Sequence, residues 1–318
     1  NLRQKFTSRR IQRNSSFDET KIFIKRFDDL VGLEEAKKIL QDVVDYIADP
    51  EKFERSGATP EKGYLLEGPT RTGKTEISKA LAGEINHALE LKGQSHRCGF
   101  KEITWAQIAR PGSLKRILSE AKKHAPCVLF IDELHNYNLQ GSADAVLLND
   151  FLTAMSGIEQ DEKNRIILVA TTNQIEKLDT SLLQHGRFGT IIHFQPPHQQ
   201  DRKNFFEQEL KKLTVDTDRI NIDLITQKTE GCSYADLRAI VTNSQFVAKK
   251  KYQPLSEKHI LKVIQSRIRR VLGNYNPLTE KEKSILATYQ AGHVMAHILL
   301  KTENIIDMVT IMPIAKTP

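Results

Sequence analysis

The stretch Gly68-Pro69-Thr70-Arg71-Thr72-Gly73-Lys74-Thr75 decides the fold of this chain. It fits the pattern G-x-x-x-x-G-K-[ST] at every fixed position, between a strand-like run at 63–67 and a helix-like run at 76–84. Glycines let consecutive N–H groups turn toward phosphate oxygens, and a helix N-terminus adds further donors. Lys74 is then expected to neutralise the outer phosphates and the Thr75 hydroxyl to hold Mg²⁺. The alternative is a chance glycine-rich turn, which the flanking runs disfavour.

The length of 318 residues allows two or three domains, and the composition is that of a soluble globular protein. No apolar run approaches the ~18–20 residues of a membrane span. The chain starts at Asn1 and stops in a patterned region, so we interpret it as a fragment. The cysteines lie far apart without a C-x-x-C pair, which disfavours a disulfide framework or a zinc ribbon and indicates a reducing compartment; they are Cys98, Cys127 and Cys232.

Positive charge is concentrated at the start of the chain. Residues 1–26 carry eight Lys or Arg and two acidic residues (8 − 2 = 6), which is most of the net charge of +7. We expect a flexible, solvated linker here, with a juxtamembrane segment or a nucleic-acid arm as alternatives. Nucleic acid is the weaker of the two, because no basic surface with interleaved aromatic residues occurs elsewhere.

Strand-like and helix-like segments alternate after this linker. Apolar periodicity predicts helices at 34–48, 114–124 and 145–156, and unbroken apolar runs predict buried strands at 127–131, 166–170 and 191–194. The polar stretch 86–100 is expected to hold an irregular strand and a loop. This order predicts an α/β fold with a doubly wound parallel sheet, whose ligand belongs at the carboxyl ends of the strands. The pattern from 200 to 272 is wholly helical, and after a break another helix starts at Thr279.

Two carboxylates follow the predicted strand at 127–131. Asp132 is expected to hold the Mg²⁺ shell of a bound nucleotide, and Glu133 to polarise the attacking water. An Asp-Glu pair alone is a common loop start. It is far more specific after a buried strand in a chain that also carries the phosphate loop.

Several ordered stretches between residues 27 and 272 resemble the ATPase module of the FtsH family, the membrane-anchored AAA+ proteases. They read F-D-D-L-V-G-L-E-E-A-K, P-E-K-G-Y-L-L-E-G-P-T-R-T-G-K-T, A-K-K-H-A-P-C-V-L-F-I-D-E-L, L-N-D-F-L-T-A-M-S-G and V-A-T-T-N…L-D-T-S-L-L-Q-H-G-R-F. The resemblance implies an AAA+ P-loop NTPase. Its parts would be a basic linker (1–26), a large α/β nucleotide-binding subdomain (27–195), an α-helical lid (196–272) and a truncated, degenerate FtsH-type peptidase region (273–318).

The resemblance also implies roles for single residues. Gly32 is expected to be one of the nucleotide-binding residues. Asn173 matches the polar residue that senses the terminal phosphate and orients water. Arg187 matches an arginine finger, which reaches the nucleotide of the neighbouring subunit and so implies a ring, usually a hexamer. A surface salt bridge is the alternative for Arg187.

The phosphate loop, the finger and the pore loop depart from the family pattern. Arg71 stands where the family has glycine, and a positive φ at that position would cost on the order of 1 kcal/mol. The finger region reads Gly186-Arg187-Phe188-Gly189-Thr190, without the family's second arginine. The aromatic pore loop that grips substrates has no clean match, and Trp105 is the nearest aromatic residue, with a core role as the alternative.

The zinc-protease motif is degenerate. Residues 289–293 align with the family's H-E-A-G-H, but Tyr289 replaces the first histidine and Gln290 replaces the glutamate base. Neutral tyrosine is a poor zinc ligand, and glutamine cannot take a proton from zinc-bound water. Only His293 remains, and a shifted pair with His297 lacks the base as well. We therefore expect no zinc.

The sequence thus predicts a subunit that binds and hydrolyses ATP with Mg²⁺ and works on protein substrates within a homomeric or mixed ring, its protease site inactive. We expect it at the face of a membrane, attached through a segment outside this chain. One alternative is a scaffold subunit of a mixed ring that binds nucleotide but hydrolyses little. The other is an active ATP-dependent zinc metalloprotease, which conflicts with Tyr289 and Gln290.

Overall fold

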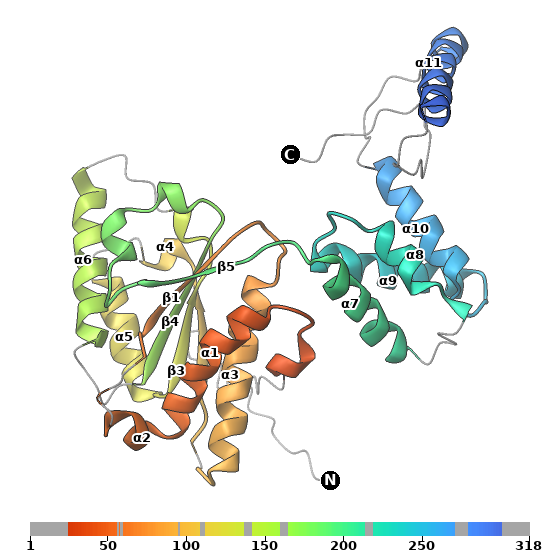
Figure 1. The fold of residues 1–318 in the computed structure, drawn as a ribbon. Coiled ribbons are helices and arrows are strands. Elements are labelled where there is room, and N and C mark those ends of the chain that lie inside the picture. Colours follow the sequence, from red (N-terminus) through yellow and green to blue (C-terminus); the bar gives the residue numbers. More distant parts are fainter. Residues whose placement is uncertain are drawn as a thin grey trace, which may run out of the picture. The chain divides into compact units, whose positions relative to one another are not determined.

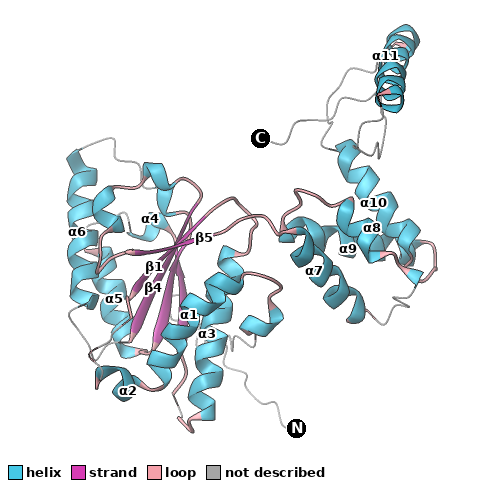
Figure 2. Ribbon diagram, viewed as in Figure 1, coloured by secondary structure: helices cyan, strands magenta, loops and turns pink. Residues whose placement is uncertain are grey.

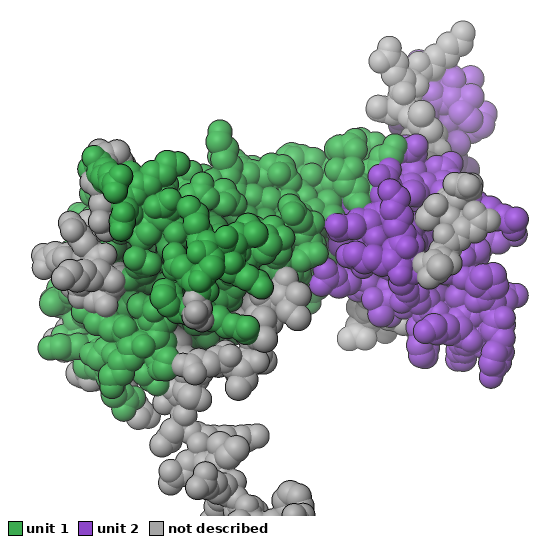
Figure 3. Space-filling model, turned by 90° about the horizontal axis from the view of Figure 1, so that it is seen from below, with its two compact units in different colours: residues 1–204, 231–236 green, residues 205–230, 237–318 purple. Residues whose placement is uncertain are grey.

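The computed structural model describes most of the chain in two compact units (Figures 1 and 3). The first comprises residues 1–204 and 231–236, and the second residues 205–230 and 237–318. The described residues are 25–55, 57, 60–94, 96–108, 112–136, 142–159, 165–213, 219–270 and 279–300. The predicted linker therefore lies outside them except for Lys25 and Arg26, which are bonded to Glu76 and Glu84.

The first unit is built on a five-stranded sheet in the order β2-β3-β4-β1-β5. Figure 2 draws the strands of this sheet in magenta. Every strand pair is parallel. β3 and β4 are buried along their whole length, which explains why their sequences are unbroken apolar runs. The predicted α/β fold with a parallel sheet is confirmed. The strands are β1 (Gly63–Glu67), β2 (Gly99–Ile103), β3 (Cys127–Ile131), β4 (Ile166–Thr172) and β5 (Thr190–His193).

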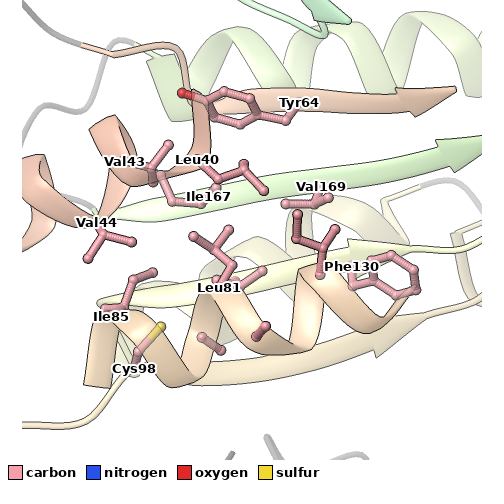
Figure 4. Close-up of a cluster of buried hydrophobic side chains, with 14 of the residues drawn as sticks. Leu40, Val43, Val44, Tyr64, Leu81, Ile85, Cys98, Phe130, Ile167 and Val169 are labelled. Carbon is pink, nitrogen blue, oxygen red and sulfur yellow. The ribbon is translucent and has the colours of Figure 1, made fainter. Parts of the chain in front are cut away.

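Helices cover both faces of this sheet, as a doubly wound fold requires (Figure 1). α1 (Glu34–Ala48) and α3 (Lys74–Leu91) pack on one face, and α5 (Ser113–Lys123) and α6 (Ser142–Glu159) pack on the other. Neighbouring strand residues alternate between the two cores, so Phe130 faces the first and Leu129 the second. Figure 4 shows Leu40, Leu81 and Val169 meeting in the first core.

The extents of three elements were wrongly predicted from the sequence: α6 begins and ends three residues beyond 145–156, β4 continues two residues beyond 170, and α3 is longer than expected. Residues 86–91, assigned to an irregular stretch, continue α3 to Leu91. The helix continues because nothing breaks it before Gly93, and because Ile85 and Leu89 stay on its buried face, at spacing four.

The remaining elements are helical. α2 (Pro50–Glu54) and α4 (Trp105–Ile108) are short, and α7 (Gln199–Lys211) begins in the first unit. The second unit contains α8 (Ile222–Gln227), most of α9 (Tyr234–Lys250), α10 (Glu257–Arg270) and α11 (Glu280–Leu299). None of the helices within the described ranges combines the length and the apolar character needed to cross a membrane. The described residues also form the 3-10 helices η1 (Phe27–Asp29), η2 (Leu134–Asn136), η3 (Ile175–Lys177) and η4 (Thr180–Leu183).

Candidate functional site

The stretch 68–75 joins the carboxyl end of β1 to the first turn of α3, where the sequence analysis placed it. Gly68 and Gly73 both have positive φ. A side chain at Gly68 would meet the carbonyl oxygen of Phe194 at 2.1 Å, so only glycine fits this approach to the chain that follows β5. Inside the loop, the buried Thr72 hydroxyl donates to the carbonyl oxygen of Pro69 at 2.9 Å. Pro69 and Thr70 are exposed, and Thr75 is half-buried.

The Lys74 side chain folds back over this loop. Its Nζ donates to the carbonyl oxygens of Gly68 at 2.6 Å and Pro69 at 2.7 Å, and the residue is 8% exposed. Burial lowers the pKa of Lys74, and the carboxylates of Asp132, Glu67 and Glu133 partly offset this by favouring the charged form. The ammonium group, the phosphate loop and the two predicted acidic residues therefore share one electrostatic neighbourhood.

A buried threonine fixes the two acidic residues after β3. The Thr171 hydroxyl donates to Asp132 Oδ1 at 2.6 Å and accepts from the backbone N–H of Glu133 at 2.9 Å. Glu133 has a φ of 53°, in the left-handed region. Asn173 follows one residue after the end of β4 and is half-buried. Thr171 was not predicted, although two polar residues at the end of a buried strand could have indicated it.

The strand pairing brings these residues to one edge of the sheet. Glu67 of β1 lies opposite Thr172 of β4, and Ile131 of β3 lies opposite Ala170. Loops that leave the carboxyl ends of β1, β3 and β4 therefore start side by side. Among the described residues, this edge carries the Lys74 ammonium group, the carboxylates of Glu67, Asp132 and Glu133 and the Asn173 amide, together with a helix N-terminus. This combination suits a phosphate ester with a divalent cation.

Gly32 lies in the same unit with a φ of 68°. A Cβ atom there would come within 2.3 Å of the Tyr234 hydroxyl and 3.0 Å of Asp201 Oδ1. Burial raises the pKa of Tyr234, as does the nearby Asp201 carboxylate. The next residue, Leu33, reaches the phosphate loop, since its Cδ1 would lie 3.2 Å from a Cβ atom at Gly73. Tyr234 and Asp201 were not predicted from the sequence.

Arg71 has a positive φ, the backbone conformation that glycine adopts most easily. Its φ of 66° lies in the left-handed region, which costs a non-glycine residue on the order of 1 kcal/mol. The side chain is 69% exposed, and its Nη1 lies 3.6 Å from Asp236 Oδ1. An ion pair at this distance with one largely exposed partner contributes little stability. Asp236 also caps the start of α9 by accepting from the Ser233 hydroxyl at 2.7 Å.

Arg187 lies at the opposite end of β1. A Cβ atom at Gly63, the first residue of β1, would come within 1.8 Å of the Arg187 carbonyl oxygen. The phosphate loop starts after the last residue of this strand, and five strand residues span roughly 13 Å. The Arg187 guanidinium bonds to a residue that precedes it closely in the chain: its Nη1 donates to the Ser181 carbonyl oxygen at 2.6 Å. The chain thus does not bring Arg187 together with its own phosphate loop.

Comparisons with known proteins agree with this geometry. A family model described as "ATPase family associated with various cellular activities (AAA)" matches residues 64–196, which hold the phosphate loop, both acidic residues and Arg187. The "ATP-dependent zinc metalloprotease FtsH" of Thermotoga maritima is 32% identical over 300 residues, covering 90% of this chain and 47% of that protein. The chain is an FtsH-like AAA protein.

Other relatives of this FtsH-like chain show the same coverage. The "ATP-dependent zinc metalloprotease FtsH 2" of Sphaerobacter thermophilus is 30% identical over 287 residues, 86% of this chain and 42% of that protein. The "ATP-dependent zinc metalloprotease YME1 homolog" of Schistosoma mansoni is 32% identical over 294 residues, 90% of this chain and 43% of that protein. The chain therefore spans less than half the length of these curated relatives.

The residues that align with the FtsH zinc motif lie on α11. The Tyr289 ring meets the His293 ring edge to face, with centroids 4.6 Å apart, and Tyr289 is 62% exposed. Gln290 is half-buried. Within the described ranges, no three His, Cys, Asp or Glu side chains gather as a metal site. The residues before α5 that were compared with the pore loop are described only up to Ile108, where α4 ends.

Replacing Thr171 with Val is expected to lower the free energy of unfolding by about 1–3 kcal/mol, because valine keeps the shape but leaves buried polar partners unpaired. ATP turnover should fall about tenfold or more as the acidic pair loses its fixed geometry. Thermal unfolding and phosphate release measure the two effects. Thr153→Val is the matched control, since its hydroxyl bonds only to backbone on the exposed face of α6. Equal behaviour of the two variants would contradict the role of Thr171.

Proposed function

We propose that this protein is an ATP-hydrolysing motor subunit that acts on protein substrates within an oligomeric ring. The observation that carries the proposal is the Thr171 bridge, which fixes Asp132 and Glu133 beside the phosphate loop. A binding-only site has no need of a carboxylate held in a strained backbone conformation next to the phosphates. The FtsH relatives carry "ATP-dependent" in their names, which supports the use of ATP here.

Each group at the site would have a defined task. The loop from Gly68 to Thr75 binds the phosphates, with Lys74 exchanging its two carbonyl partners for phosphate oxygens. The oxygens of Thr75 and Asp132 suit Mg²⁺, which would neutralise phosphate charge. Glu133 accepts a proton from the attacking water, and Asn173 orients that water. Gly32 would contribute to nucleotide binding.

The position of Arg187 supports a ring. It lies at the end of β1 that is remote from its own phosphate loop. Its guanidinium would exchange its bonds to Ser181 and Gln184 for the nucleotide of a neighbouring subunit. There it would stabilise the charge of the transferring phosphoryl group. A hexamer is the assembly we propose, either homomeric or mixed.

We propose further that the peptidase chemistry of the FtsH family is lost. Tyr289 is a poor zinc ligand and Gln290 cannot act as a base, so α11 would not hold zinc or activate water. The motor would then remodel or translocate proteins without cutting them. A membrane segment outside this chain would place it at a membrane face, in a reducing compartment.

Arg71 and Thr190 favour a second candidate, a scaffold subunit that hydrolyses little. Arg71 adds strain to the phosphate loop, and Thr190 stands where the family has a second arginine. Against it stand the intact side chains of Lys74, Asp132 and Glu133.

The decisive experiment measures phosphate release and casein cleavage on one preparation of the full-length protein with Mg²⁺, ATP and Zn²⁺. We expect sustained phosphate release and no casein peptides. Absence of ATP turnover would contradict the proposed motor function and favour the scaffold subunit. Casein cleavage that a zinc chelator stops would show that the peptidase is active.

A further inference from the structure

Glu61 lies just before β1, and its carboxylate bonds to both sides of the segment that carries Arg187. Its Oε1 accepts from His185 Nδ1 at 2.7 Å, and its Oε2 accepts from the Thr190 hydroxyl at 3.0 Å. The Glu61 side chain is 19% exposed and the His185 side chain 86% exposed, so the bond to Thr190 is the more sheltered of the two contacts. One residue thus ties together two points that flank Arg187 in the sequence.

Gly189 provides the space that this carboxylate occupies. A Cβ atom at Gly189 would lie 2.7 Å from Glu61 Oε1 and 2.9 Å from Oε2. The φ of Gly189 is not positive, so its backbone conformation is one that residues with a side chain also adopt. A side chain at Gly189 would therefore displace the Glu61 carboxylate from its present position.

The backbone between these two contacts is fixed as well. The Arg187 carbonyl oxygen lies against Gly63, which has no room for a side chain. The Phe188 ring is fully buried and stacks on Phe151 of α6, with centroids 6.3 Å apart. The Phe188 N–H donates to the Leu182 carbonyl oxygen at 2.9 Å. The Arg187 side chain donates from Nη1 to the Ser181 carbonyl oxygen at 2.6 Å and to Gln184 Oε1 at 3.3 Å.

We propose that Glu61 is a positioning residue for Arg187: its carboxylate, seated in the space left by Gly189 and bonded to His185 and Thr190, sets the direction in which Arg187 leaves its segment. The inference rests on the proposed function, in which Arg187 serves the nucleotide of a neighbouring subunit. Glu61 itself lies at the start of β1, remote from its own phosphate loop. It acts through Arg187 alone.

The first test separates turnover from binding in the full-length protein. Glu61→Ala is expected to lower kcat for ATP about tenfold or more, since small displacements of a catalytic group have effects of this size. The dissociation constant for a fluorescent ADP analogue should change less than about twofold, because the variant's own phosphate loop is untouched. Glu61→Gln keeps one acceptor oxygen and should lose less. Glu51→Ala removes an exposed carboxylate of α2 and serves as the matched control.

Gly189→Ala provides an independent route to the same defect. Its methyl group displaces the Glu61 carboxylate, so its kcat should fall to the level of Glu61→Ala. The double variant should show no further loss, because both changes remove one interaction. If Glu61→Ala does not fold, Gly189→Ala and Glu61→Gln carry the test. A normal kcat in the folded variants, or fully additive losses, would overturn the inference.

Mixed assemblies test whether the effect acts on a neighbour. Glu61→Ala subunits have an intact phosphate loop, whereas Lys74→Ala subunits have an intact Arg187 segment. Mixing them should raise turnover several-fold above the sum of the separate proteins. The reference mixture is Arg187→Ala with Lys74→Ala. If the reference mixture gains activity and the mixture of Glu61→Ala with Lys74→Ala does not, the shared site stands and only the inferred role of Glu61 is wrong. If the reference gains none, the shared site is wrong and the role of Glu61 falls with it.

Discussion

Replacing Glu133 with Gln should reduce ATP turnover at least about 100-fold, because an amide cannot accept the proton of the attacking water. Nucleotide affinity should stay within a few fold of the unmodified protein. The substitution keeps the side-chain shape, and the bond from the residue-133 N–H to Thr171 does not depend on the side chain. Phosphate release and equilibrium binding of a fluorescent ATP analogue measure the two quantities.

The control for this prediction is Glu51→Gln, an exposed carboxylate whose Arg55 partner is equally exposed. It should leave turnover unchanged. An unchanged rate in Glu133→Gln would contradict the motor and favour the scaffold. A lost affinity would show that Glu133 contributes to binding, and its role as a base would then need separate support.

Replacing Lys74 with Ala should weaken nucleotide binding at least about 100-fold. The ammonium group makes charge-assisted hydrogen bonds to phosphate in a buried setting, and two such bonds at about 1.5–3 kcal/mol each account for this loss. Without nucleotide the effect should be much smaller. Burial lowers the pKa of Lys74, which means that the fold penalises its charge until phosphate arrives.

Thermal unfolding measures both parts of this second prediction. The nucleotide-induced rise in Tm should vanish in Lys74→Ala, whereas Tm without nucleotide should change little. Lys79→Ala, on the same helix and half-buried, is the control and should retain the rise. A nucleotide-induced rise in Lys74→Ala would contradict the assigned role of this lysine.

Local patterns were sufficient to predict the phosphate loop and the main strands. The loop is a contiguous stretch with its own glycines, and the runs that form β3 and β4 are apolar because both faces of each strand are buried. α1 was predicted with both of its ends, since Asp49 and Pro50 interrupt its apolar period. The extent of α3 was underestimated, because polar residues on its outer side obscured the buried face that continues to Leu89.

The contacts that complete the site join residues far apart in the chain. Thr171 is 39 residues from Asp132, and Thr190 is 129 residues from Glu61. No periodicity or short motif encodes such pairs, so they become visible only when the strands are in register. The sequence showed Thr190 only as the loss of the family's second arginine, next to Gly189. The fold shows that both residues lie at the place taken by the Glu61 carboxylate.

β1 connects two loops that would serve two different nucleotides. Its carboxyl end continues into the phosphate loop, and its first residue lies against the Arg187 carbonyl oxygen. The strand is paired with β4 along its whole length and with β5 along most of it, so it cannot stretch or bend independently. β1 is therefore held rigid by its two neighbouring strands. Because each of the five residues of β1 is paired with β4, the strand offers no hinge between the phosphate loop and the segment that carries Arg187.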